Sequence, residues 1–230
     1  MLRSRQTAQH FESTSTHAVH GQYLLFLPQR YETHPAKRWP LILFLHGSGE
    51  RGTDLAKVRA HGPPKIVQEQ PDFPFIVISP QCPNRQLWSN ELLLPLLDHA
   101  LEQYRVDRSR VYLTGLSMGG YGAWNLGLAH PTRFAAVAPI CGGGDILPVL
   151  LARAPELKAL KTLPIWAFHG EKDPVVPLCE SERMIAVLKG IGNSARLTLY
   201  PDAGHDSWTE TYNNPALYRW FLSHRRRGAR

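Results

Sequence analysis

The chain has 230 residues, of which 43% are hydrophobic and 20% charged, with a formal net charge of +7 at pH 7. This length and composition are those of a single soluble enzyme domain that can bury a full core. No apolar run is long enough for a transmembrane helix or a secretory leader, so we expect a cytoplasmic protein without membrane insertion, with secretion left open.

The apolar pattern predicts strands that alternate with helices. Two antiparallel strands are expected at residues 10–16 and 22–28, then strands near Leu41, Phe75, Val111, Phe134, Ile165 and Leu197, with helices over 91–104, 118–130, 179–191 and 215–224. This alternation predicts a mostly parallel sheet with a ligand site at the carboxyl ends of its strands. Residues 141–163 have room for a loop and one short helix, so we expect no large lid domain. We expect one domain over residues 1–230, with flexible tails at 1–8 and 225–230.

The most informative motif is the pentapeptide Gly-Leu-Ser-Met-Gly at residues 115–119. It lies between the predicted strand near Val111 and the helix over 118–130, which is the context of a nucleophile elbow. Glycines on both sides allow the sharp turn that a side chain would block. The motif therefore predicts that Ser117 is a catalytic nucleophile.

A serine nucleophile needs a base, and the base needs an orienting carboxylate. Asp173 follows the predicted strand near Ile165, and His205 follows the last predicted strand in a Gly-His turn. Both loops lie at the same edge of a parallel sheet as Ser117, so we predict a triad of Ser117, His205 and Asp173.

Other residues compete for these roles. Glu171 lies two residues before Asp173, but the shorter aspartate beside Pro174 is favoured as the orienting acid. Asp202 and Asp206 flank His205, but they share its loop and would have to fold back to reach it. His169 ends a predicted strand and is expected to be buried and hydrogen-bonded.

The oxyanion hole is expected from two backbone N–H groups. One belongs to Met118, directly after the nucleophile. The other belongs to the small-residue loop that follows the strand near Leu41, with Ser48 as the first choice and Gly49 as the second. We expect His46 to brace this loop.

The basic character and the cysteines have simpler interpretations. Four arginines lie in the last six residues (Arg225, Arg226, Arg227 and Arg230), and without them the net charge is +3 (7 − 4). No nucleic-acid-binding motif accompanies them, so we expect a solvated tail and no nucleic-acid partner. The cysteines (Cys82, Cys141 and Cys179) lack metal-site spacing, which predicts reduced thiols and no metal.

Four motifs in order resemble the α/β-hydrolase superfamily, and more narrowly its phospholipase/carboxylesterase group with the feruloyl-esterase-like and predicted-peptidase branches. They are His-Gly-Ser-Gly-Glu-Arg-Gly at 46–52, Gly-Leu-Ser-Met-Gly-Gly at 115–120, His-Gly-x-x-Asp-x-x-Val-Pro at 169–177, and Gly-His at 204–205. The resemblance covers residues 20–222. It implies an eight-stranded, mostly parallel sheet flanked by helices, a Ser-Asp-His triad and no cofactor.

The resemblance also implies that the loop over residues 79–88 lines the substrate pocket. Gln81 and Trp88 are therefore candidate substrate contacts, together with Gly49 and Trp208. Trp88 and Trp208 have a second interpretation as core residues.

Together these features predict a serine carboxylesterase that acts on short-chain or aryl esters as a monomer or homodimer. Two alternatives stay open at this point. One is a serine peptidase with the same triad, and the other is a non-catalytic binding protein on the same scaffold.

Overall fold

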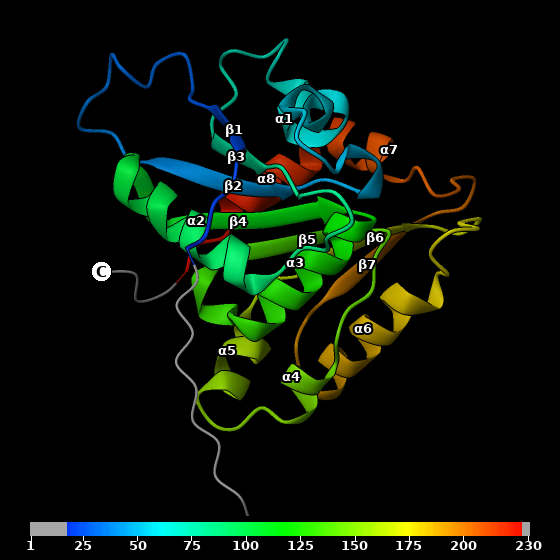
Figure 1. The fold of residues 1–230 in the computed structure, drawn as a ribbon. Helices are drawn as coiled ribbons and strands as arrows, with labels where there is room; N and C mark the ends of the chain where they lie inside the picture. The colour runs from blue at the N-terminus through cyan, green and yellow to red at the C-terminus, as the bar shows by residue number, and fades with distance from the viewer. Residues whose placement is uncertain (1–17, 227–230) are drawn as a thin grey trace, which may run out of the picture.

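The computed structural model describes residues 18–226, which contain one seven-stranded sheet (Figure 1). The strands are β1 (Tyr23–Phe26), β2 (Trp39–Leu45), β3 (Ile76–Pro80), β4 (Val106–Leu116), β5 (Ala136–Ile140), β6 (Trp166–Gly170) and β7 (Arg196–Tyr200). Their order across the sheet is β1-β3-β2-β4-β5-β6-β7. Only β1 is antiparallel to its neighbour, which confirms the predicted mostly parallel sheet. The eighth predicted strand, at residues 10–16, lies outside the described residues.

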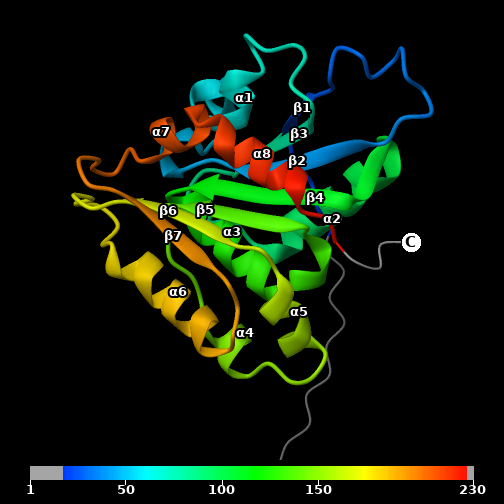
Figure 2. The ribbon, with the colours of Figure 1, turned by 180° about the vertical axis from the view of Figure 1, so that it is seen from behind.

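Helices cover both faces of the sheet (Figures 1 and 2). One face carries α2 (Asn90–Gln103), α3 (Met118–Ala129), α4 (Leu147–Leu150), α5 (Glu156–Thr162) and α6 (Cys179–Gly190); the other carries α1 (Gly62–Ile66), α7 (Trp208–Asn213) and α8 (Pro215–Ser223). Three short 3-10 helices complete the described part: η1 (Ser48–Glu50), η2 (Leu55–Ala60) and η3 (Pro131–Arg133).

The central strand β2 explains why both faces need helices. All seven of its residues are buried. Leu41, Leu43 and Leu45 pack into the core on the α3 face, whereas Ile42 and Phe44 pack into the core beneath α7 and α8. A continuous apolar run of this kind is typical of a parallel strand that is covered on both sides.

The segment between β5 and β6 differs from its prediction. It forms two short helices, α4 and α5, instead of one. Residues 151–155 separate them, and Pro155 lies directly before the first residue of α5. Both helices pack on the α3 face of the sheet. Helix α4 contacts α3 and α6, and helix α5 contacts η3. Neither helix extends over the carboxyl edge of the sheet (Figure 1).

The C-terminal tail predicted over residues 225–230 is anchored at its first two residues. The N–H of Arg226 donates to the carbonyl of Ser109 at 2.8 Å, and Arg225 Nη1 donates to Asp107 Oδ2 at 3.2 Å. Arg225 and Arg226 are therefore not part of a fully solvated tail, because both donate hydrogen bonds to residues of β4. The rest of both predicted tails lies outside the described residues. No helix within residues 18–226 has the length and apolar character needed to cross a bilayer.

Candidate active site

Ser117 lies in a sharp turn between β4 and α3. Its backbone has φ 53° and ψ −118°, in the left-handed half of conformational space that L-residues rarely adopt. Such a conformation costs roughly 1–3 kcal/mol and is maintained by the surrounding packing. A Cβ on Gly115 would collide with the backbone of Gly119, and one on Gly119 would collide with the backbone of Leu45. The two glycines of the motif are thus required by close backbone packing.

The hydroxyl of Ser117 is the first member of a chain of two hydrogen bonds. Ser117 Oγ lies 2.9 Å from His205 Nε2, and His205 Nδ1 lies 2.8 Å from Asp173 Oδ2. The side chain of His205 is 19% exposed, and that of Asp173 is fully covered. The loops after β6 and β7 therefore bring the three predicted triad residues together.

Asp173 is held as a carboxylate. Burial alone would raise its pKa, but hydrogen bonds from His205 and from the backbone N–H groups of Val176 and Val175 outweigh burial and lower the pKa below its ordinary value. The two backbone bonds both reach Oδ1, at 2.8 and 2.9 Å, which leaves Oδ2 directed at His205. The carboxylate thus fixes which ring nitrogen of His205 carries the proton.

A second imidazole contacts the same carboxylate, which the sequence did not indicate. His169 is fully buried as predicted, and its Nε2 lies 2.9 Å from the carbonyl of Val176 and 3.3 Å from Asp173 Oδ2. Both neighbours are acceptors, so the proton belongs on Nε2. His169 therefore supports the position and the charge of Asp173.

The residues that competed for the triad roles lie elsewhere. Glu171 is exposed, and Asp202 pairs with Lys172 at 2.7 Å in solvent. Asp206 accepts hydrogen bonds from the N–H and hydroxyl of Thr209, both at 2.9 Å. None of these carboxylates has an ion pair or hydrogen bond with His205 within the described residues.

The proposed oxyanion donors begin two helices. Met118 is the first residue of α3, and Ser48 is the first residue of η1. N–H groups at the start of a helix have no partner inside the helix. The η1 loop passes close to the nucleophile, because a Cβ built on Gly47 would lie 3.7 Å from Ser117 Cβ. Both segments that flank Ser117 thus carry an N–H group without a partner inside its own helix.

His46 braces the η1 loop as predicted. It is 1% exposed, its Nε2 accepts the N–H of Cys82 at 3.0 Å, and its Nδ1 donates to the carbonyl of Gly47 at 2.6 Å. Burial lowers the pKa of His46, although the bond to Gly47 opposes this shift. The neutral ring therefore connects the η1 loop to the loop after β3.

The four candidate substrate contacts fall into two groups. Trp88 and Gln81 are 8% and 4% exposed; Trp88 Nε1 donates to the carbonyl of His46 at 3.0 Å, and Gln81 Nε2 donates to the carbonyl of Glu50. These two side chains therefore hold the backbone of the η1 loop in place through its carbonyl groups. Trp208 is partly exposed with its ring 5.2 Å from that of His205, and Gly49 is exposed beside Ser48. These two remain accessible to a substrate.

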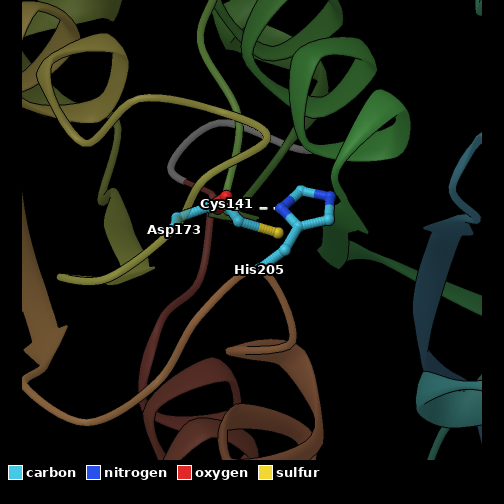
Figure 3. A group of neighbouring side chains, drawn as sticks. All are labelled: Cys141, Asp173 and His205. Carbon is cyan, nitrogen blue, oxygen red and sulfur yellow. Dashed lines mark hydrogen bonds and ion pairs between the residues drawn. The ribbon is translucent and has the colours of Figure 1, made fainter.

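Cys141 lies beside the Asp173–His205 pair (Figure 3). Its sulfur, a carboxylate oxygen of Asp173 and a ring nitrogen of His205 lie within 4.8 Å of one another, a donor set that Zn²⁺ accepts in other proteins. Burial, reinforced by the carboxylates of Asp173 and Asp206, raises the pKa of the Cys141 thiol to about 12. A cation would therefore have to displace protons from both the thiol and the imidazole.

Comparisons with known proteins identify the family of the chain. Residues 86–214 match the family described as Phospholipase/Carboxylesterase, which is more than half of the chain. A poly(3-hydroxyoctanoate) depolymerase of Pseudomonas fluorescens is 24% identical over 97% of this chain and 88% of its own length. A probable feruloyl esterase C of Aspergillus terreus is 26% identical over 68% of this chain and 56% of its own length.

Solved structures give the same result. A thermostable esterase superposes with a TM-score of 0.71 and 36% identity, over 89% of this chain and 59% of that one. A ferulic acid esterase superposes with a TM-score of 0.68 over 86% of this chain and 89% of its own, and at 21% identity this likeness shows the fold alone. The chain belongs to the phospholipase/carboxylesterase family and has the α/β-hydrolase fold that its motifs predict.

Proposed function

We propose that this esterase is a serine carboxylesterase that hydrolyses short-chain or aryl carboxylic esters through an acyl-enzyme. The observation that carries the proposal is the chain of hydrogen bonds from Asp173 through His205 to Ser117, with lengths of 2.8 and 2.9 Å. Distances in this range allow direct proton transfer between the serine and the imidazole.

The chemistry follows from the positions of these atoms. His205 Nε2 accepts the proton of Ser117 as Oγ attacks the ester carbonyl carbon, and the carbonyl oxygen becomes an oxyanion. The N–H groups of Met118 and Ser48 stabilise that oxyanion, and each is worth roughly 3 kcal/mol in such sites. His205 then protonates the departing alcohol, which leaves Ser117 acylated. Water repeats the sequence and releases the carboxylic acid, while Asp173 stabilises the imidazolium in both halves.

The preference for short or aryl esters rests on the surroundings of Ser117. No helix of the described residues covers the carboxyl edge of the sheet, so substrates need no lid to open. Trp208 presents an aromatic ring beside His205, against which an aryl group can pack. The feruloyl esterase names among the relatives are consistent with an aryl acyl group.

The test is a hydrolysis panel of p-nitrophenyl esters from acetate to palmitate, with methyl ferulate and a peptide amide alongside. We expect the highest kcat/KM for the short esters and turnover of the ferulate ester. A preference for the amide over its matched ester would identify a peptidase instead.

The nucleophile is tested separately. Ser117→Ala should lower kcat by at least about 10⁴-fold, because no other group can form the acyl-enzyme. Ser223→Ala is the matched control, because this exposed serine at the end of α8 makes only local hydrogen bonds, to the carbonyl of Trp220 and to His224 Nδ1. Labelling of the wild type by a fluorophosphonate probe, absent in Ser117→Ala, would distinguish an enzyme with an untested substrate from a non-catalytic binding protein.

A further inference from the structure

Three arginines from separate segments gather at the amino end of β4, far from Ser117 at its carboxyl end. We call Arg108, Arg133 and Arg226 the arginine cluster. Arg226 hydrogen-bonds to the backbone beside each of the other two arginines. Its N–H donates to the carbonyl of Ser109, next to Arg108, and its Nη1 donates to the carbonyl of Thr132, next to Arg133. Figure 1 shows the chain after α8 returning to this end of β4.

The carboxylates near the arginine cluster do not balance its positive charge. Asp107 pairs with both Arg110, at 2.6 Å, and Arg225, at 3.2 Å. Asp98 pairs with Arg133. Within residues 18–226, neither Arg108 nor Arg226 makes an ion pair, so the arginine cluster carries three guanidinium groups against one carboxylate.

Arg226 has the least favourable surroundings of the three. Its side chain is partly buried, and its Nε is buried without an acceptor among the described residues. Burial and the positive charges of Arg133 and Arg108 lower the pKa of its guanidinium. A covered cation beside two like charges is costly unless an anion neutralises it.

Arg108 still has donors to offer such an anion. Its side chain is exposed, and its recorded hydrogen bond, from Nη2 to the carbonyl of Leu101 at 3.1 Å, leaves most of its N–H groups free. Guanidinium groups bind tetrahedral oxyanions through pairs of parallel N–H···O bonds, which are stronger than bonds between neutral groups.

We infer that Arg108, Arg133 and Arg226 form a binding site for a phosphate group, separate from the catalytic edge of the sheet. The chemistry admits two sources of that group, free phosphate and the headgroup of an anionic lipid. The inference does not depend on the proposed esterase reaction.

The first experiment measures the melting temperature in sodium phosphate and in sodium chloride of equal ionic strength at pH 7. A site with a dissociation constant near 1 mM would raise the melting temperature by about 4 °C in 20 mM phosphate. The rise should be lost in Arg226→Gln and reduced in Arg108→Gln. It should be retained in Arg219→Gln, which removes the same charge from an exposed position on α8.

A rise of equal size in all four proteins would mean that phosphate acts as a general stabilising salt, and it would overturn the inference. If Arg226→Gln does not fold by circular dichroism, Arg108→Gln decides the matter, because Arg108 is exposed. Isothermal titration of the wild type with phosphate gives an independent affinity, and absence of binding at 10 mM would also overturn the inference.

Vesicles identify the source of the phosphate group. Co-sedimentation with phosphatidylglycerol vesicles but not with phosphatidylcholine vesicles, lost in Arg226→Gln and competed by free phosphate, would assign a lipid headgroup. Binding of free phosphate without co-sedimentation would assign a small soluble ligand. Both results support the site, whereas binding of neither ligand rejects it.

Discussion

Replacement of Asp173 by asparagine tests the proposed catalytic chain at its least exposed member. The Oδ1 position accepts two backbone N–H groups, from Val175 at 2.8 Å and Val176 at 2.9 Å, so the amide oxygen of asparagine must take this position. The amide NH₂ then occupies the position of Oδ2, 2.8 Å from His205 Nδ1. Because two donors cannot face each other, the proton of His205 moves to Nε2, and Nε2 can no longer accept the proton of Ser117.

This change of tautomer sets the size of the effect. Loss of the correct tautomer in a Ser-His-Asp triad lowers kcat by about 10⁴-fold. At 1.36 kcal/mol for each factor of ten, the barrier rises by roughly 5.4 kcal/mol. We expect this loss in kcat on p-nitrophenyl butyrate, with little change in KM because Asp173 is fully covered and does not contact substrate. A variant that keeps kcat within tenfold of the wild type would refute the assignment of Asp173.

Asp206→Asn provides the matched control. It removes the same charge next to His205, but its carboxylate only accepts hydrogen bonds from Thr209, a role that asparagine also fulfils. We expect its kcat to stay within about threefold of the wild type, because neither the tautomer nor the position of His205 depends on Asp206.

The effect of Asp173→Asn on stability depends on pH. Folding lowers the pKa of Asp173, so its stabilisation is complete above the ordinary value of 3.8 and is lost as the pH falls through the lower folded pKa. Asparagine lacks this titration. The difference in the free energy of unfolding between the two proteins should therefore narrow below pH 3.8.

Three further predictions concern the supports of the site. Trp88→Phe leaves the His46 carbonyl without its donor and should lower the free energy of unfolding, measured by urea denaturation, by about 1–3 kcal/mol. A several-fold rise in KM at unchanged stability would instead favour direct contact of Trp88 with the substrate. Burial lowers the pKa of His46 below its ordinary value of 6.5, so stability should decrease as the pH falls below 6.5 toward the lowered pKa; an NMR titration midpoint at or above 6.5 would contradict this. Cys179 alone should react rapidly with Ellman's reagent, because Cys82 and Cys141 are buried, and a second fast thiol would show that the fold opens there.

The sequence predicted those parts of the site that a local pattern requires. Ser117 could be chosen as the candidate nucleophile because its turn needs glycines at 115 and 119, where a Cβ would strike the backbone. Asp173 and His205 were identifiable because each directly follows an apolar strand of a parallel sheet. In each case the signal comes from a few residues that are adjacent in the sequence, so it can be recognised without the structure.

The supporting residues could not be assigned in this way. The contact of Trp88 with His46 spans 42 positions, and that of Gln81 with Glu50 spans 31, and no periodicity encodes such a pairing. The same holds for Arg226, which reads as part of a charged tail until β4 is seen to offer it the carbonyl of Ser109. These polar groups are buried because loops that are distant in the sequence pack against one another, and the folded sheet determines which loops become neighbours.

The length of β4 separates the proposed reaction from the proposed phosphate site. β4 bulges between Val106 and Val111, so that Val106 and Gly115 pair with Trp39 and Leu45 of β2, which are six residues apart (45 − 39). The two ends of β4 therefore lie roughly 20 Å apart at about 3.3 Å per residue. At physiological ionic strength the Debye length is about 8 Å, so a phosphate group on the arginine cluster changes the potential at His205 very little. Phosphate should therefore raise the melting temperature without changing kcat or its pH dependence. If kcat changed together with phosphate occupancy, an electrostatic cause would be excluded, and a coupled movement of β4 or α3 would have to connect the two ends of the sheet.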